Sequence, residues 1–127
     1  MSLEHYVILV VEDDPDAREL MQAVLEQRGA TVLTADSVAT AFELFEEKRP
    51  DVIVSDIAMP EEDGFGLVKR VRALAPEKGG DKPIVALSAY AAKSDRVRAL
   101  SPRFTQYLHK PVDFEELVST IQAVTKK

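Results

Sequence analysis

Acidic side chains gather at two points of the sequence, and their types and spacing could bind a metal ion. Glu12, Asp13 and Asp14 are consecutive and directly follow the apolar run at residues 6–11, while Asp56 follows another apolar run. Carboxylates held together in a cleft repel one another, so they stay ionised together only when a cation is present. Oxygen ligands without histidine or cysteine favour Mg²⁺ over zinc. The pattern therefore predicts a magnesium site built from carboxylates.

Two further residues would complete a site for a phosphoryl group. Ser88 and Lys110 each follow a different apolar segment, and they supply a hydroxyl donor and a fixed positive charge. Phosphoryl transfer depends mainly on charge neutralisation and positioning, and a carboxylate can itself be the nucleophile and become an acyl phosphate. Asp56 is the best candidate nucleophile because it stands alone after the central predicted strand. Taken alone, Asp56 fits a helix-capping or solvated acid equally well; its combination with Asp13, Ser88 and Lys110 favours the phosphoryl site.

These side chains have to be positioned by alternating strands and helices. Apolar runs rich in β-branched residues predict five strands, at residues 6–11, 31–35, 52–55, 84–87 and 106–109. Helical periodicity predicts five helices, which begin near residues 15, 38, 67, 91 and 114. Strand–helix–strand units form parallel sheets with helices on both faces, and functional groups gather beyond the carboxyl ends of the strands. The predicted fold is a doubly wound α/β domain, a three-layer sandwich.

Some local features have simpler structural interpretations. Asp14 precedes Pro15, so it is favoured as a helix cap over a metal ligand. Asp113 is expected to cap the last helix in the same manner. Residues 75–83 contain two consecutive glycines and are expected to form a mobile surface loop.

Composition excludes several classes of protein. A chain of 127 residues without cysteine fits one domain and excludes a disulfide scaffold, a thiolate zinc site and a cysteine nucleophile. The net charge of −6 argues against direct nucleic-acid binding, because the densest basic group, Lys69, Arg70 and Arg72, is expected on one solvated helix face. The longest apolar run is far shorter than the roughly 20 residues of a membrane span, and no export signal is evident. We therefore expect a soluble cytoplasmic protein without membrane contact.

Four segments together resemble the receiver domain of two-component response regulators, the CheY-like family. They are ILVVEDDPD at 8–16, VIVSDIAMPEEDG at 52–64, ALSAY at 86–90 and YLHKPV at 107–112. The resemblance covers nearly the whole chain, and it implies one receiver domain at residues 4–127. It also implies a flavodoxin-like parallel sheet with strand order 2-1-3-4-5 and five helices.

The resemblance implies roles for the residues that match. Asp56 would accept a phosphoryl group from a phosphohistidine of a partner and would contribute to the metal site. Asp13 would ligate Mg²⁺ directly, Glu12 would contribute through water, and the backbone carbonyl of Ala58 would be a third protein ligand. Lys110 would pair with the phosphoryl oxygens. The isolated domain would catalyse only its own phosphorylation and dephosphorylation.

Further implied roles concern the switch and its supporting backbone. Ser88 would hydrogen-bond the phosphoryl group and move inward, which would let Tyr107 change its rotamer. The Lys110–Pro111 peptide bond is expected to be cis. Gly64 falls where the family uses a left-handed turn.

Two residues are expected to tune the lifetime of the phosphoryl group. Ala58 is small and apolar, and Tyr90 is bulky. Our hypothesis is that this pair offers no polar group to orient an attacking water molecule and partly shields the phosphorus atom, so that hydrolysis of the phosphorylated form is slow. Ala58 also argues against an alternative function, an aspartyl-nucleophile phosphohydrolase, because such enzymes usually carry a second acid at this position. A nucleotide-binding fold is disfavoured because residues 64–66 lack the third glycine of the fingerprint.

The implied partners are a sensor histidine kinase or a histidine phosphotransfer domain. The fourth helix, fifth strand and fifth helix would form the face for an output protein, a fused domain or a dimer. Pro102 departs from the family pattern in the segment before the last strand, so the sequence leaves open which output partner this face binds. Residues 83–100 resemble receivers of hybrid histidine kinases more than receivers fused to DNA-binding domains. Both a stand-alone regulator and a domain excised from a longer kinase remain open.

Overall fold

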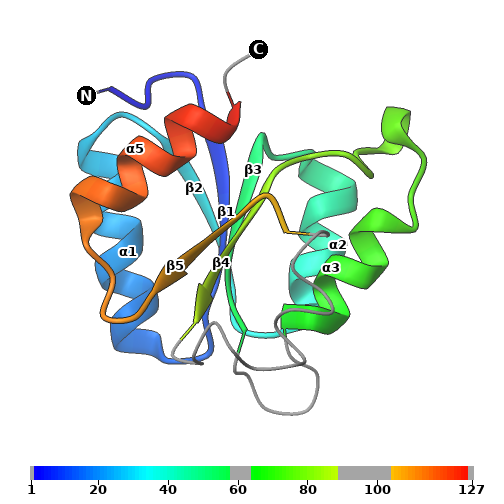
Figure 1. Cartoon of the computed structure of the whole chain (residues 1–127), viewed down its shortest axis with the longest axis horizontal. Helices are drawn as coiled ribbons and strands as arrows, with labels where there is room; N and C mark the ends of the chain where they lie inside the picture. The colour runs from blue at the N-terminus through cyan, green and yellow to red at the C-terminus, as the bar shows by residue number, and fades with distance from the viewer. Residues whose placement is uncertain (1, 58–63, 89–103, 126–127) are drawn as a thin grey trace.

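Five parallel strands form one sheet in the order β2-β1-β3-β4-β5, as predicted (Figure 1). The structure is a computed structural model that describes residues 2–57, 64–88 and 104–125. The strands are β1 (Val7–Val11), β2 (Thr31–Ala35), β3 (Val52–Asp56), β4 (Ile84–Ser88) and β5 (Gln106–His109). Every residue of β3 and β4 is buried, as expected for central strands covered by helices on both faces.

Helices cover both faces of the sheet. The described ranges contain four α-helices, α1 (Pro15–Gln27), α2 (Val38–Lys48), α3 (Gly64–Arg72) and α5 (Phe114–Thr125), and the 3₁₀ helix η1 (Pro76–Lys78). Helices α1 and α5 pack on one face, and α2 and α3 pack on the other (Figure 1). Each pair encloses its own apolar cluster, around Leu25 and Leu117 on one side and around Phe45 on the other. The three-layer sandwich is thus confirmed; the helix predicted at residues 91–100 lies outside the described residues.

Polar caps fix the starts of the two helices nearest the predicted site. The Asp14 carboxylate accepts a hydrogen bond from the backbone N–H of Asp16 at 3.1 Å, and Pro15 is the first residue of α1. This confirms Asp14 as a helix cap. The Asp113 carboxylate accepts two backbone N–H groups in the first turn of α5, at 2.9 and 3.3 Å. Both caps satisfy helix N–H groups that would otherwise lack partners.

Residues 75–83 form a compact turn that contains η1 and lies mainly at the surface, and their predicted mobility stays a prediction. Nη1 of Arg72 donates to the carbonyl oxygens of Gly80 and Lys82, at 2.9 and 2.6 Å. A Cβ atom on Gly80 would lie 1.8 Å from the carbonyl oxygen of Leu74, so the chain passes too closely for a side chain. Arg72 is therefore partly buried instead of lying on a solvated helix face, and this burial lowers the pKa of its guanidinium.

A few boundaries differ from the sequence-based expectation. Asp56 and Ser88 are the last residues of β3 and β4, because their backbones still pair with the neighbouring strands. Gly64, expected in a left-handed turn, is the first residue of helix α3. The predicted domain start at residue 4 stays a prediction, and Leu3 just before it is fully buried. No helix in the described ranges is long and apolar enough to span a membrane.

Candidate functional site

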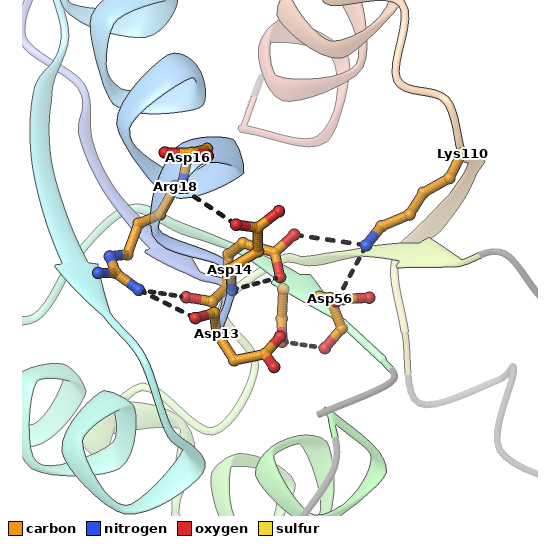
Figure 2. Close-up of polar contacts among 8 residues, drawn as sticks. Asp13, Asp14, Asp16, Arg18, Asp56 and Lys110 are labelled. Carbon is orange, nitrogen blue, oxygen red and sulfur yellow. Dashed lines mark hydrogen bonds and ion pairs between the residues drawn. The ribbon is translucent and has the colours of Figure 1, made fainter. Parts of the chain in front are cut away.

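The carboxyl edge of the sheet brings the predicted site residues together from four strands. Asp56 ends β3 and Ser88 ends β4, whereas Glu12 and Lys110 directly follow β1 and β5. These strands are parallel neighbours, so their carboxyl ends lie at one edge. Figure 2 shows the acidic loop after β1 facing Asp56, with the side chain of Lys110 extending toward them from the opposite side.

Three carboxylates form a cluster that could hold one cation. Glu12, Asp13 and Asp56 each offer one oxygen atom, and these atoms all lie within 4.8 Å of one another. Glu12 and Asp56 are only 2% and 3% exposed, and Asp13 is more exposed. One cation can bridge oxygens at this spacing, and a site made only of oxygen ligands suits Mg²⁺, which usually retains several waters. The residues present therefore fit the predicted metal.

Lys110 supplies the positive charge at the cluster. Its Nζ atom lies 2.9 Å from Oδ2 of Asp56 and 3.3 Å from Oε1 of Glu12. The backbone N–H of Lys110 donates to the carbonyl of Ser88 at 3.0 Å, and the Lys110–Pro111 bond is cis, as predicted. Burial alone would lower the pKa of the lysine, but hydrogen bonding and charge attraction to Asp56 and Glu12 raise it. Lys110 is therefore firmly cationic at this edge of the sheet.

Glu12 is the carboxyl group most strongly affected by its surroundings. Burial raises the pKa of Glu12 to about 7, and the hydrogen bond and negative charge of Asp56 add to this rise. Lys110 and the backbone N–H of Asp14, 3.4 Å from Oε2 of Glu12, act in the opposite direction. Near neutral pH the metal-free site therefore retains a proton for part of the time, and this proton competes with a cation.

The two predicted switch residues lie on adjacent strands. Ser88 is buried at the end of β4, beside the strand that carries Asp56. Tyr107 lies on β5, paired in register with Ala86. Its ring is partly buried, 5.2 Å from the ring of Phe104, and burial raises the pKa of the phenol. A coupled movement of Ser88 and Tyr107 stays a prediction, and Ala58 and Tyr90 lie outside the described residues.

Arg18 is a residue of the site that the sequence analysis missed. Its Nη1 atom donates to the backbone carbonyl of Glu12 at 2.9 Å and approaches the carbonyl of Asp13 at 3.5 Å (Figure 2). Side chains on a helix lean toward its N-terminus, so a long side chain in the first turns of α1 can reach back over the loop that precedes it. This position, five residues after Asp13, is the signal that could have identified Arg18.

Comparison with known proteins assigns the chain to a protein family. The sequence profile of the response regulator receiver domain matches residues 8–122. The chain therefore belongs to the response regulator receiver family. This result confirms the family resemblance.

Individual relatives agree with this assignment. An uncharacterized 14.6 kDa protein in the sodA1 3' region of Leptolyngbya boryana is 50% identical over 121 residues, which are 95% of this chain and 91% of that protein. Response regulator MprA of Mycobacterium ulcerans is 36% identical over 94% of this chain, which spans only 50% of the relative. The chain thus resembles both a relative of its own size and part of longer regulators.

Solved structures show the same fold. The receiver domain of sensor histidine kinase PA1611 from Pseudomonas aeruginosa superposes with a TM-score of 0.85 at 32% identity, covering 96% of this chain and 98% of that one. That structure has a magnesium ion coordinated in its active site cleft. Chemotaxis protein CheY4 of Vibrio cholerae gives a TM-score of 0.84 at 30% identity, covering 94% of this chain and 98% of that one.

Proposed function

We propose that this chain is a phosphoacceptor switch of a two-component phosphorelay, in which Asp56 accepts a phosphoryl group from a phosphohistidine in a Mg²⁺-dependent reaction. The observation that carries the proposal is the 2.9 Å ion pair between Lys110 Nζ and Asp56 Oδ2, next to the carboxylates of Glu12 and Asp13. A nucleophilic carboxylate, a fixed cation and acidic metal ligands are the groups that phosphoryl transfer requires.

The proposed transfer begins with attack by a carboxylate oxygen of Asp56 on the phosphorus atom. An O–P bond forms while the P–N bond of the phosphohistidine breaks, and the electron pair of that bond returns to the imidazole nitrogen. Lys110, whose ammonium group already contacts Asp56, would neutralise the negative charge of the incoming phosphoryl oxygens. Glu12 and Asp13 would hold Mg²⁺ together with Asp56, and the carbonyl of Ala58 would be a further ligand. When bound, Mg²⁺ would offset the negative charge of the carboxylates and the phosphoryl group.

The signal would then pass from the phosphoryl group to the surface near β5. Ser88 would donate its hydroxyl to a phosphoryl oxygen, and Tyr107 on the neighbouring strand would change its rotamer. Phosphorylation would in this way shift a two-state equilibrium of the face formed by residues 91–100, β5 and α5. This face is the proposed contact for an output protein, a fused domain or a second copy of the chain.

The proposed phosphodonor is a sensor histidine kinase or a histidine phosphotransfer domain. Family membership supports such a partner, because receivers take part in two-component signalling. The similarity to the receiver of sensor histidine kinase PA1611 supports a hybrid kinase as one setting. The relative of similar size from Leptolyngbya boryana supports a stand-alone regulator as another. Both settings use the same phosphoacceptor chemistry.

The side chains at positions 58 and 90 are proposed to slow hydrolysis of the phosphorylated form. Ala58 offers no polar group to orient water, and Tyr90 would shield the phosphorus atom. In this proposal, Tyr90→Ala speeds the loss of the phosphoryl group after the phosphodonor is removed. An unchanged rate of dephosphorylation would contradict the shielding.

The test of the proposed function is intact-mass measurement after incubation with acetyl phosphate and Mg²⁺. We expect the wild-type chain to gain one phosphoryl group, and we expect Asp56→Asn to gain none. Asp16→Asn is the matched control, because Asp16 is an exposed acid in the first turn of α1, outside the carboxylate cluster. No gain by the wild-type chain would contradict the proposal. Sustained turnover of p-nitrophenyl phosphate would instead favour the phosphohydrolase.

A further inference from the structure

We propose that Arg18 is a positioning residue that fixes the backbone of Glu12 and Asp13, and thereby holds their carboxylates in the arrangement that binds a divalent cation. The inference rests on the proposed function, because it takes the Glu12–Asp13–Asp56 cluster as the cation site. Arg18 itself would contact neither the cation nor the phosphoryl group. Its effect would reach the metal site through the loop between β1 and α1.

The hydrogen bonds of this loop support the positioning role. Nη1 of Arg18 donates to the carbonyl oxygen of Glu12 at 2.9 Å, with the Asp13 carbonyl at 3.5 Å from the same atom. On its other side, the backbone N–H of Glu12 donates to the carbonyl of Ala35 in β2 at 3.0 Å. Glu12 is therefore held from both sides, by the sheet at its N–H and by Arg18 at its carbonyl.

The backbone of Arg18 strengthens this link. Its own N–H donates to the carbonyl of Asp14 at 2.9 Å, and the Asp14 side chain caps α1. The guanidinium group therefore extends from a helix turn that is itself anchored to the loop. Arginine stays charged at all relevant pH values and has a rigid planar donor group, so the link to the loop does not depend on pH.

A metal site of this kind needs such a link because its ligands repel one another. Glu12 and Asp13 are consecutive, and both face Asp56, so the metal-free loop gains by moving the carboxylates apart. Any such movement would have to be reversed when the cation binds, and the cost would appear as weaker affinity. Residues that orient metal ligands typically contribute about 10- to 100-fold in affinity. We therefore expect Arg18 to act on cation affinity more than on the chemistry at Asp56.

The surroundings of Arg18 allow the residue to be replaced without disturbing the core. Its side chain lines an open cleft of about 250 Å³ between α1 and the β2–α2 connection, together with Thr34, Asp36 and Thr40. Removing the guanidinium group enlarges a cleft that is already open, and Arg18 belongs to neither apolar cluster. Arg18→Met keeps the length of the side chain and the helix propensity, but removes the donors and the charge.

The experiment is calorimetric titration of the unphosphorylated chain with MgCl₂. We expect Arg18→Met to weaken Mg²⁺ binding about tenfold or more, and Arg18→Lys to recover part of the affinity through its ammonium group. Arg28→Met is the matched control, because it removes the same charge from the far end of α1 and is expected to bind Mg²⁺ within twofold of wild type. Thermal unfolding of each variant verifies that it is folded. Equal Mg²⁺ affinity in Arg18→Met and wild type would overturn the proposal.

A second measurement separates positioning from general damage to the fold. Phosphorylation by acetyl phosphate is followed at low and at saturating Mg²⁺ concentrations. We expect Arg18→Met to be slow at low Mg²⁺ and to approach the wild-type rate at saturating Mg²⁺, since Asp56 and Lys110 are intact. A rate that stays low at saturating Mg²⁺ would overturn the positioning role. If the wild-type chain neither binds Mg²⁺ nor takes up a phosphoryl group, the proposed function itself fails, which is a distinct outcome.

Discussion

The Nζ atom of Lys110 lies 2.9 Å from Oδ2 of Asp56, and this ion pair connects the residue that follows β5 to the end of the central strand β3 (Figure 2). Asp56 is almost fully buried, and the side chain of Lys110 is 31% exposed. The same ammonium group reaches Glu12, so one cation offsets two buried carboxylates. The pair therefore has both a stabilising role and a role in the proposed phosphoryl chemistry.

Replacing Lys110 with methionine should destabilise the metal-free domain at neutral pH. The substitution leaves the buried Asp56 and Glu12 carboxylates without their cation, and we expect a loss of roughly 1–3 kcal/mol, less than for a fully buried pair. The measurement is urea unfolding in EDTA. The matched control is Lys48→Met, which breaks an exposed 3.5 Å pair with Glu47 and should change stability by less than about 0.5 kcal/mol. Equal losses of stability for the two substitutions would contradict the role of Lys110 as the cation that offsets the buried carboxylates.

The raised pKa of Glu12 predicts a specific pH dependence of stability. The ordinary value of 4.5 applies to the unfolded chain, and the folded metal-free value is about 7, so the folded state binds this proton more tightly. The contribution of this proton to the free energy of unfolding is therefore complete below about pH 4.5 and is lost as the pH rises through about 7. The total loss is no more than about 3 kcal/mol. Glu12→Gln should remove this part of the pH dependence in urea unfolding with EDTA. The exposed Glu19→Gln on α1 is the control, and an unchanged pH profile in Glu12→Gln would refute the prediction.

Magnesium should stabilise the folded chain through Asp13. A ligand at 100 times its Kd adds about 2.7 kcal/mol to the free energy of unfolding. We expect such a gain for wild type and for Asp16→Asn, and a much smaller one for Asp13→Asn at the same Mg²⁺ concentration. Thermal unfolding with and without MgCl₂ measures the difference. An equal gain in stability for Asp13→Asn would show that Asp13 is not a ligand of the metal site.

The compact turn after α3 predicts a strong effect of a small substitution. Gly80→Ala would place a Cβ atom against the backbone oxygen of Leu74, and we expect a loss of at least about 2 kcal/mol. Urea unfolding measures this loss. Mg²⁺ affinity should change little, because this turn follows α3 and precedes β4, away from the carboxyl edge of the sheet. Stability equal to wild type would contradict the close approach of Gly80 to the backbone of Leu74.

Local signals predicted most of the fold and the principal residues of the site. Buried apolar runs predicted the parallel strands, and the Asp14–Pro15 pair predicted the start of α1. The rule that parallel strands end at one edge then brought Glu12, Asp56 and Lys110 together, although Glu12 and Lys110 are 98 positions apart in the chain.

The residues that escaped prediction act through backbone carbonyl groups. Arg18 and Arg72 each donate to carbonyl oxygens of nearby turns, and every residue type carries such an oxygen. The types of the side chains alone therefore do not reveal these bonds, and for Arg18 only its position in the first turns of α1 pointed to the preceding loop. The same reason explains why Arg72 was expected on a solvated face. Periodicity reports which face of a helix is apolar, but it does not report where a long polar side chain ends.

The most direct test of the central claim is to locate the phosphoryl group on the chain. After incubation with acetyl phosphate and Mg²⁺, borohydride reduction converts an aspartyl phosphate to homoserine, and peptide mass spectrometry then identifies the modified position. We expect homoserine at position 56, and none when EDTA replaces Mg²⁺ or when the chain carries Asp56→Asn. Homoserine at Asp13 or at another acid, or equal labelling of Asp56 without Mg²⁺, would contradict the proposed function.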